Sequence, residues 1–341
     1  PLRNLFDYLP PDDCSVETVS PGQRLQVPFG KGSVRIGIII SMSKTSVVPK
    51  HKLKKAIALL DKVPLLSKKH LQLIEWASHY YHHPIGDVAF TSIPVALRKG
   101  KAAKIQQELI WRPTCTGKKL DSDELSHAKK QLMLFQFIRQ YPDGVSQSQI
   151  TNKFENSRQP LEALFTKKLI EKINISEVRI HSKILSSQHE DLWCIKPNKE
   201  QQNAIDKIVS SSAAYHAFLI NGVTGSGKTE VYLQVIRHIL GSDKQALVLV
   251  PEIGLTPQFI NLIKKRFGEN VVVLHSGLSE SERLLGWLRA RDGRAPVVLG
   301  TRSAIWTPMP NLGTIIIDEE HDLSYKQQDG LRYSARDLAL I

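Results

Sequence analysis

The stretch Gly222–Thr229 has the composition of a loop that binds phosphate. Its sequence, Gly-Val-Thr-Gly-Ser-Gly-Lys-Thr, fits the pattern G-x-x-x-x-G-K-[S/T] in full. The glycines let backbone N–H groups point at phosphate oxygens, and a helix that starts after the loop adds partial positive charge. The expected contacts to a nucleotide come from Gly222, Thr224, Gly225, Ser226, Gly227 and Lys228, with the Thr229 hydroxyl binding Mg²⁺.

Two acidic residues follow an apolar run further along the chain. Thr314–Ile317 is typical of a buried parallel strand, and catalytic groups of open α/β sheets lie at the carboxyl ends of strands. Asp318 is placed there to hold Mg²⁺ through water, and Glu319 to orient and deprotonate an attacking water. Taken alone, the pair also fits an acidic helix start. The phosphate loop upstream favours the catalytic interpretation.

The elements that must position these residues begin near residue 197. There the sequence alternates strand-like and helix-like segments, which predicts a parallel sheet with helices on both faces. The predicted strands are Ala217–Asn221, Ala246–Val250, Val271–Leu274, Val297–Gly300 and Thr314–Ile317. The loop therefore follows a predicted strand and opens a helix, which is the context that its pattern requires.

The earlier part of the chain contains two segments with different sequence patterns. Residues 1–100 read as short strands and turns with one helix, which begins at the N-cap candidate Ser67 and runs to about Tyr81. Residues 128–180 predict three helices, then a strand at 169–173 paired with 178–180. This is the winged-helix pattern, found in DNA-binding modules and also in spacers and protein contacts. The predicted domains are 1–105, 106–182 and 183–341.

Composition and charge exclude several classes of protein. The chain has 341 residues, is 41% hydrophobic and contains no apolar run near the roughly 18 residues of a membrane span. Cys14, Cys115 and Cys194 lie far apart, which argues against a Cys-x-x-Cys site and for the cytoplasm. Of 46 Lys and Arg against 33 Asp and Glu, almost all the excess falls in residues 1–200. An anionic polymer is the expected partner there, although a solvated basic surface is also consistent.

Several motifs together resemble one family. The phosphate loop and Asp-Glu-Glu-His at 318–321 are similar to motifs I and II of superfamily 2 nucleic-acid helicases. Residues 251–258 look like motif Ia, and 300–304 like motif Ib. With residues 275–283, 27–30 and 80–88, the whole set resembles the bacterial replication-restart helicases, the primosomal protein N′ family. The resemblance covers nearly the whole chain, but in residues 101–180 it is one of architecture only. It implies a β-rich DNA-binding domain, a winged helix and a RecA-like lobe, an α/β multidomain class.

The resemblance implies a pocket for the 3′-terminal nucleotide of a nascent leading strand. The matching residues are Phe6, Asp7, Tyr8, Gly30 and Lys54. A carboxylate accepts a hydrogen bond from a free 3′-OH and repels a 3′-phosphate, aromatic rings stack on bases, and a lysine pairs with phosphate. The alternative is that Phe6 and Tyr8 are strand core residues and Asp7 a turn residue. Lys55 fits the lysine position as well as Lys54.

In the helicase part the resemblance implies further roles. Gln201 would read adenine, although an exposed helix residue is the alternative. His321 joins Lys228, Asp318 and Glu319 among the implied catalytic residues. An aromatic-rich loop would couple DNA contact to ATP hydrolysis, with Tyr325 and Tyr333 stacking on bases unless it is an ordinary surface loop. The implied phosphate contacts are Arg302, Lys326 and Arg332.

Several parts of that family lie outside this sequence. Motif III, the second helicase lobe with its arginine finger, and the cysteine-rich zinc region are missing, so zinc is expected only in that missing half. Without the arginine, worth about 10³–10⁵ in rate, the fragment should bind nucleotide weakly and turn over negligibly.

Three functions fit the sequence. The first is an ATP- and Mg²⁺-dependent 3′-to-5′ helicase of replication forks, with single-stranded DNA, a single-stranded-DNA-binding protein and primosome proteins as partners and no membrane. The second is a non-catalytic fork-binding module. The third is another superfamily 2 DNA translocase.

Overall fold

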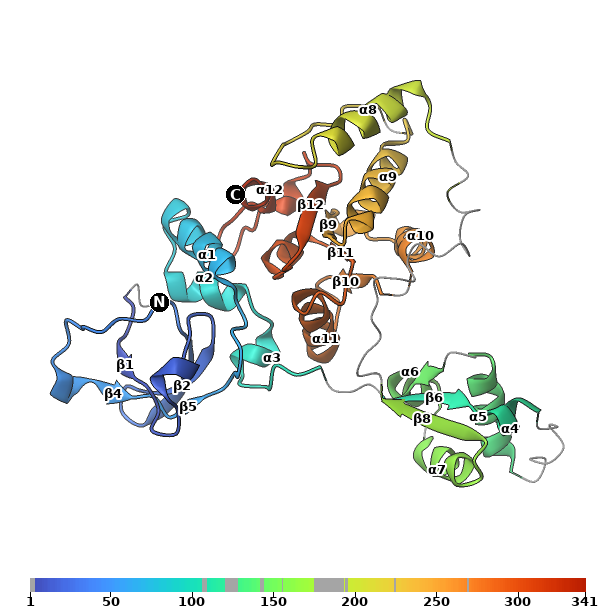
Figure 1. The fold of residues 1–341 in the computed structure, drawn as a ribbon, viewed down its shortest axis with the longest axis horizontal. Helices are drawn as coiled ribbons and strands as arrows, with labels where there is room; N and C mark the ends of the chain where they lie inside the picture. The colour runs from blue at the N-terminus through green and yellow to red at the C-terminus, as the bar shows by residue number, and fades with distance from the viewer. Residues whose placement is uncertain are drawn as a thin grey trace. The chain divides into compact units, whose positions relative to one another are not determined.

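The computed structural model describes residues 4–105, 109–119, 128–141, 144–154, 156–174, 193, 196–223, 225–268 and 270–341. These residues fall into two compact units (Figure 1). One unit joins Pro1–Lys104 to Ile180–Ile341, and the other is Ile105–Arg179. No helix in the described ranges is long and apolar enough to cross a membrane. Each unit is described by itself, and the division into domains at 105 and 182 stays a prediction.

The N-terminal part of the first unit contains two small sheets. The strands β2 (Arg24–Phe29), β3 (Ser33–Ile38) and β5 (Ala58–Leu59) form an antiparallel sheet in the order β3-β2-β5. The strands β1 (Tyr8–Leu9) and β4 (Lys54–Lys55) pair in parallel. Short 3₁₀ turns, η1 (Val16–Thr18) and η2 (Lys50–Lys52), lie between strands. The predicted mixture of short strands and turns is confirmed.

Three helices follow: α1 (Lys68–Tyr80), α2 (Ile85–Thr91) and α3 (Val95–Arg98). The Ser67 side chain accepts a hydrogen bond from the His70 backbone N–H, so the predicted N-cap is confirmed. A fully buried Arg24 joins the sheet to α3, since its guanidinium pairs with Asp61 at 2.7 Å and donates to the Leu97 carbonyl at 2.7 Å. Strands and helices of this part therefore share one core.

The C-terminal part of the first unit is a parallel sheet with helices around it. Its strands, in the order β10-β11-β9-β12, are β10 (Val272–Leu274), β11 (Val297–Gly300), β9 (Gln245–Leu249) and β12 (Leu312–Ile317). The helices are α8 (Lys199–Ser210), α9 (Lys228–Gly241), α10 (Pro257–Phe267), α11 (Glu280–Arg291) and α12 (Ala335–Ala339). The 3₁₀ turns are η5 (Glu252–Gly254), η6 (Arg302–Trp306) and η7 (Leu323–Tyr325). Four of the five predicted strands are confirmed.

The fifth predicted strand, Ala217–Asn221, is not one. These residues form no strand, and Leu219 is 76% exposed. β12 is consequently an edge of the sheet in the described residues, and its residues Ile315–Ile317 are only half-buried. A short apolar run has the composition of a strand, but its pairing depends on neighbours that a local pattern does not contain. The phosphate loop therefore opens a helix without following a strand.

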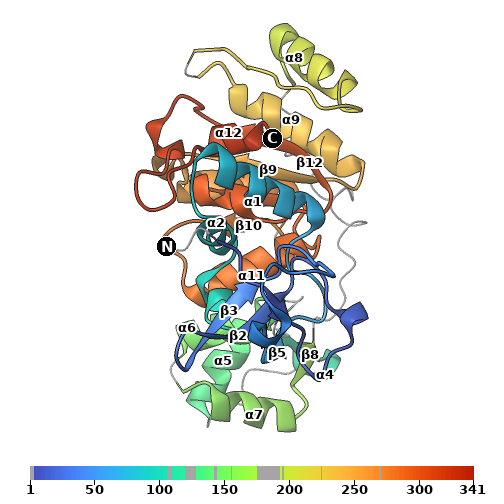
Figure 2. The ribbon, with the colours of Figure 1, turned by 90° about the vertical axis from the view of Figure 1, so that its left-hand side faces the viewer.

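The two parts of the first unit meet through buried contacts. The Trp287 indole N–H of α11 donates to the Ser92 carbonyl at 3.3 Å, and both residues are buried. The Tyr81 hydroxyl accepts from the Ser334 backbone N–H at 3.2 Å and donates to the Asp337 carboxylate at 3.2 Å. Figures 1 and 2 both show α1 beside α12. The N-terminal helices are thus joined directly to the segment that follows β12.

One buried histidine lies in this joint and makes it sensitive to acid. His70 of α1 lies beside the Trp306 backbone, and its Nε2 has no hydrogen-bond partner among the described residues. Burial lowers the pKa of His70 from 6.5 to about 4. As the pH falls from 6.5 toward 4, His70 takes up a proton in the unfolded chain but not in the folded chain. The folded state therefore loses stability relative to the unfolded state.

We expect the free energy of unfolding to fall between pH 7.5 and 5.5 by about 1 kcal/mol more in the wild type than in His70→Gln, because the substitution removes the titrating group. Urea unfolding at the two pH values measures the difference. The control is His79→Gln on the same helix, since His79 is exposed. A His70→Gln variant with the wild-type pH dependence would contradict the expectation.

The second unit has its own small core. Its helices are α4 (Cys115–Lys119), α5 (Lys129–Arg139), α6 (Gln147–Lys153) and α7 (Arg158–Thr166). The strands β7 (Val145–Ser146), β6 (Leu109–Pro113) and β8 (Ile170–Asn174) form an antiparallel sheet in that order. The three predicted helices and the strand near 170 are confirmed. β8 pairs with β6, and its predicted partner at 178–180 lies outside the described residues.

Candidate nucleotide and DNA-end sites

The phosphate loop ends where α9 begins, as its pattern predicts. Gly225 and Gly227 both have φ of +81°, a left-handed conformation that glycine adopts readily. A Cβ on Gly227 would also meet the Gln201 side-chain nitrogen at 2.3 Å, so a larger residue there would push the end of that side chain away from the loop. The Lys228 ammonium donates to the Gly222 carbonyl at 2.7 Å and to the Val223 carbonyl at 3.2 Å. The Lys228 side chain thus folds back onto the carbonyls at the start of its own loop.

Gln201 connects the loop to the start of α8. Its amide nitrogen donates to the Ser226 carbonyl at 2.9 Å, and its amide oxygen accepts from the Asn198 backbone N–H at 2.9 Å. The Asn198 side chain in turn caps α8. The structure therefore brings Gln201 to the loop, although both polar ends of its amide are engaged within the chain. Thr224 lies outside the described residues.

The acidic residues lie at the carboxyl end of β12, as predicted. One carboxylate oxygen of Asp318 accepts from the Glu319 backbone N–H at 3.0 Å, and the other accepts from the Tyr232 hydroxyl at 3.1 Å. Glu319 has φ of +47°, a conformation that is strained for a side-chain residue and is often found at functional sites. His321 lies 3.6 Å from the Glu319 carboxylate, and both are exposed.

The chemistry of these groups fits a magnesium–nucleotide complex. Thr229 supplies a hydroxyl and Asp318 a carboxylate, and hard oxygen donors of this kind suit Mg²⁺, which keeps several waters and takes further ligands from phosphate. Lys228 supplies the positive charge for the phosphates. Sequence reasoning missed Tyr232, whose position in an apolar helix run gave no sign that its hydroxyl reaches Asp318.

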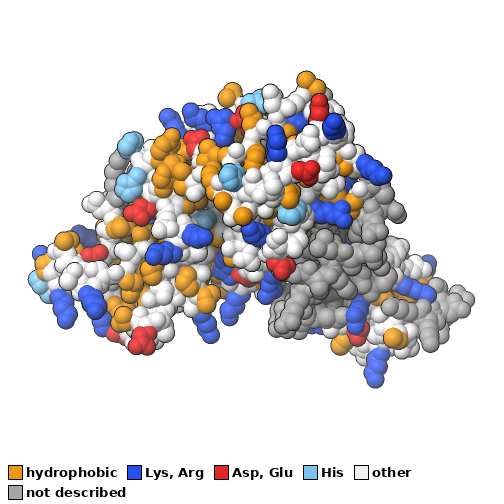
Figure 3. Space-filling model, turned by 45° about the horizontal axis from the view of Figure 1, so that its top comes forward, with side chains coloured by type: hydrophobic (Ala, Val, Ile, Leu, Met, Phe, Trp, Pro, Cys, Tyr) orange, Lys and Arg blue, Asp and Glu red, His pale blue; other side chains and the backbone are white. Residues whose placement is uncertain are grey.

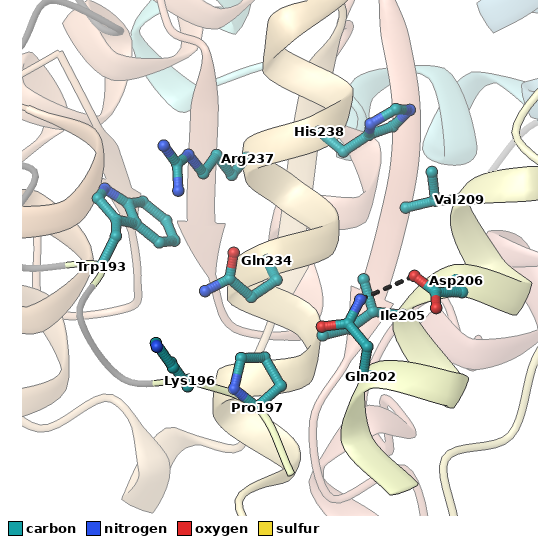
Figure 4. Close-up of a pocket in the computed structure, with 10 residues that line it drawn as sticks. All are labelled: Trp193, Lys196, Pro197, Gln202, Ile205, Asp206, Val209, Gln234, Arg237 and His238. Atoms are coloured by element: carbon teal, nitrogen blue, oxygen red, sulfur yellow. Dashed lines mark hydrogen bonds between the residues drawn. The ribbon is translucent and has the colours of Figure 1, made fainter. Parts of the chain in front are cut away.

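A pocket of about 340 Å³ opens between α8 and α9 (Figure 4). Gln234, Arg237 and His238 come to it from α9, while Trp193, Lys196 and Pro197 come from the segment before α8. The Arg237 and Arg266 guanidinium groups lie 4.7 and 4.5 Å from the centre of the Trp193 ring. The ring is therefore already engaged by two cations, and none of the residues that line the pocket belongs to the phosphate loop.

The aromatic-rich loop differs from the prediction. Tyr325 and Tyr333 are each only 3% exposed, so neither ring is open for stacking on a base. The Tyr325 hydroxyl donates to the Leu249 carbonyl at 3.0 Å and to the Asp318 carbonyl at 2.6 Å. Tyr333 packs edge-on against Trp306 with ring centres 5.3 Å apart. Apolar burial outweighs exposure for these rings, and the loop is fastened to the end of β12.

The cationic residues of this region differ in their contacts and exposure. The Arg302 guanidinium donates through one nitrogen to the Ser324 carbonyl at 3.0 Å and the Lys326 carbonyl at 3.1 Å, so it holds the loop. Its side chain is partly exposed, and its contact with DNA phosphate stays a prediction. The side chains of Lys326 and Arg332 are exposed. These two remain open to phosphate contacts.

The residues of the proposed 3′-end pocket come together in the N-terminal part. The parallel pairing of β1 with β4 places Tyr8 opposite Lys54. The Lys54 ammonium donates to the Gly30 carbonyl at 3.3 Å, and the Tyr8 hydroxyl to the Pro28 carbonyl at 3.0 Å. Lys55 instead pairs with Asp12. The geometry thus favours Lys54 over Lys55 as the lysine beside the turn after β2.

Phe6 and Asp7 extend the same cluster. Phe6 is 51% exposed, and its ring meets Phe29 edge-on at 5.4 Å. The Asp7 carboxylate is exposed and accepts a hydrogen bond from the Ser46 hydroxyl. Neither Phe6 nor Asp7 is therefore a core residue. The sequence showed Phe29 only as part of a turn, and nothing pointed to Ser46, far along the chain.

Two family models match separate parts of the chain. Residues 1–94 match a 3′ DNA-binding domain, and residues 198–340 match the DEAD/DEAH box helicases. The first match covers the clustered residues around Tyr8, and the second covers the phosphate loop and Asp318.

Curated relatives match over nearly the whole chain. The replication restart protein PriA of Haemophilus influenzae is 42% identical over 100% of this chain and 46% of its own length. The PriA proteins of Chlamydia pneumoniae and Bacillus subtilis are 32% and 30% identical over 100% and 98% of this chain, and over 45% and 49% of their own lengths. The chain thus spans about half the length of the curated relatives it matches. It belongs to the PriA family of replication restart proteins and corresponds to their N-terminal half.

Proposed function

We propose that this chain is the fork-reading and nucleotide-binding half of an ATP-dependent DNA helicase. The whole protein would move 3′ to 5′, recognise stalled or abandoned replication forks and initiate primosome assembly for replication restart. One observation carries the proposal: the residues that suit a strand end and those that suit a nucleotide belong to the same compact unit. The names of the relatives, replication restart proteins, support it.

The nucleotide half of the proposal follows from the groups around the loop. Lys228 would turn from the loop carbonyls to the β- and γ-phosphates of ATP, and Thr229 and Asp318 would hold Mg²⁺. The ion would supply charge neutralisation on the phosphate oxygens. Glu319 would orient the attacking water and take its proton, with His321 beside it.

The DNA half follows from the cluster around β1 and β4. Asp7 would accept a hydrogen bond from a free 3′-OH, and Phe6 would stack on the terminal base. Lys54 would pair with a backbone phosphate. On the face in Figure 3, Lys and Arg side chains are more abundant than Asp and Glu, which suits a polyanion. Lys326 and Arg332 would contact single-stranded DNA.

A non-catalytic fork-binding module is the second candidate. Because residues 217–221 lie outside the sheet, the phosphate loop lacks the strand that would hold its first half. DNA-stimulated phosphate release by the full-length protein separates the two candidates, since only the helicase would show it and this chain alone is expected to turn over negligibly. Another superfamily 2 translocase would account for the phosphate loop but not for the cluster of Phe6, Asp7 and Tyr8. A single-stranded-DNA-binding protein and primosome proteins in the cytoplasm are the proposed partners of the whole protein.

Fork binding tests the proposal through two neighbouring lysines. We expect Lys54→Ala to weaken binding to a fork with a 3′-OH leading-strand end by up to about fivefold, because it removes one phosphate contact. The dependence of log affinity on log salt should lose a slope of about 1. Fluorescence anisotropy between about 50 and 200 mM salt measures both.

Lys55→Ala is the matched control, since Lys55 pairs with Asp12 and not with the cluster. Equal effects of the two substitutions would count against the end pocket. Wild-type binding that hardly changes with salt would contradict the electrostatic part of the proposal.

A further inference from the structure

A buried tyrosine lies beside the carboxylate that suits Mg²⁺. Tyr232 lies three residues after Thr229 on α9 and is only 4% exposed. Its hydroxyl donates to the Asp318 carboxylate at 3.1 Å. This bond ties the helix that opens at the phosphate loop to the carboxylate at the end of β12.

These bonds leave room for a metal ion. A phenolic O–H donates one hydrogen bond, and Tyr232 donates its own to Asp318. Asp318 accepts only one bond from each of its two neighbours, the Tyr232 hydroxyl and the Glu319 backbone N–H. Because each carboxylate oxygen has two lone pairs, one on each stays available to a water on Mg²⁺.

The environment keeps this hydroxyl protonated. Burial raises the pKa of Tyr232, and the negative charge of Asp318 raises it further. The phenol thus stays a donor at every pH at which the protein would work. Partners that orient metal ligands from behind are worth about 10- to 100-fold in metal affinity.

We propose that Tyr232 is a positioning residue that orients the Asp318 carboxylate for the Mg²⁺ of the nucleotide. The inference rests on the proposed nucleotide site and adds a residue to it. Tyr232 would not touch the nucleotide or the ion. It fixes the direction of a carboxylate at the end of β12 from the helix that also carries Lys228 and Thr229.

Tyr325 offers a matched control. It is also a buried tyrosine, and its hydroxyl also bonds to Asp318, but to the backbone carbonyl at 2.6 Å and not to the carboxylate. Tyr232→Phe and Tyr325→Phe each remove one buried hydroxyl near the same residue. Only the first releases the carboxylate that would face Mg²⁺.

The experiment measures binding of a fluorescent ATP analogue to the full chain as Mg²⁺ is added, and again in EDTA. We expect Tyr232→Phe to raise the Mg²⁺ concentration at half-saturation about tenfold and to leave the affinity in EDTA unchanged. Tyr325→Phe should leave the Mg²⁺ midpoint at the wild-type value. Thermal unfolding of the three proteins verifies that each is folded.

Each other outcome overturns the inference in a distinct way. If Tyr232→Phe weakens binding equally with and without Mg²⁺, or shifts the midpoint no more than Tyr325→Phe, then Tyr232 is structural only. If the wild type binds no nucleotide at any Mg²⁺ concentration, the proposed nucleotide site itself is wrong. The two failures are thus told apart by the wild-type titration.

Discussion

Replacing Lys228 by alanine should lower the affinity of this chain for MgATP by roughly 10- to 100-fold. Hydrogen bonds between charged groups contribute about 1.5–3 kcal/mol, and each 1.4 kcal/mol is a factor of ten in affinity. Lys228 is the cation that the phosphate loop itself supplies, and its ammonium already lies 2.7 Å from the Gly222 carbonyl. The substitution removes that charge without changing the glycines that shape the loop.

Titration with a fluorescent ATP analogue in the presence of Mg²⁺ measures the loss. Lys207→Ala is the matched control, because Lys207 is an exposed lysine of α8 in the same part of the chain. It should bind like the wild type. If Lys228→Ala and Lys207→Ala bind MgATP equally well, the loop does not hold the nucleotide. That result would contradict the proposal that the helicase uses ATP.

Asp7→Ala should abolish the preference of the chain for a free 3′ end. We expect the wild type to bind a fork with a 3′-OH roughly 10- to 100-fold more tightly than the same fork with a 3′-phosphate. The Asp7 carboxylate would accept a hydrogen bond from the hydroxyl but would repel the phosphate, and a hydrogen bond to a charged group contributes about 1.5–3 kcal/mol. The alanine variant should bind the two forks alike.

Two further variants separate charge from hydrogen bonding. Asp7→Asn keeps an acceptor and removes the charge, so it should recover binding to the 3′-phosphate while still binding the 3′-OH. Asp13→Ala, which removes an exposed carboxylate nearby in the sequence, should behave like the wild type. Anisotropy with the two forks measures all four proteins. Equal wild-type binding to both forks would leave a generic basic surface and make Phe6 and Asp7 structural residues.

The residues that sequence predicts well are those whose role is local. The Ser67 cap, the loop that opens α9 and the acidic residue at the end of β12 each follow from a short pattern and from general rules about helix and strand ends. Their positions do not depend on which distant segment packs beside them. The strands β9 and β11 were equally clear, because they are apolar throughout and fully buried.

The features that sequence missed depend on tertiary contacts. The run at 217–221 has a strand composition but pairs with no strand among the described residues, because pairing is decided by the rest of the sheet. Tyr325 and Tyr333 lie in a loop rich in polar residues, where stacking on a base was the natural interpretation. In the structure Tyr325 finds buried carbonyls and Tyr333 a buried ring. No pattern within the loop shows that its aromatic side chains turn inward.

The buried joint between the N-terminal helices and the segment after β12 has a geometrical consequence. Trp287 with Ser92, and Tyr81 with Ser334, fasten the two parts to each other at separate points. A strand end held near β1 and a phosphate chain held before α9 would then be attached to one frame. Under the proposed function, such a frame would act as a ruler, with the first nucleotides held by the helicase lobe at a set distance from the recognised strand end.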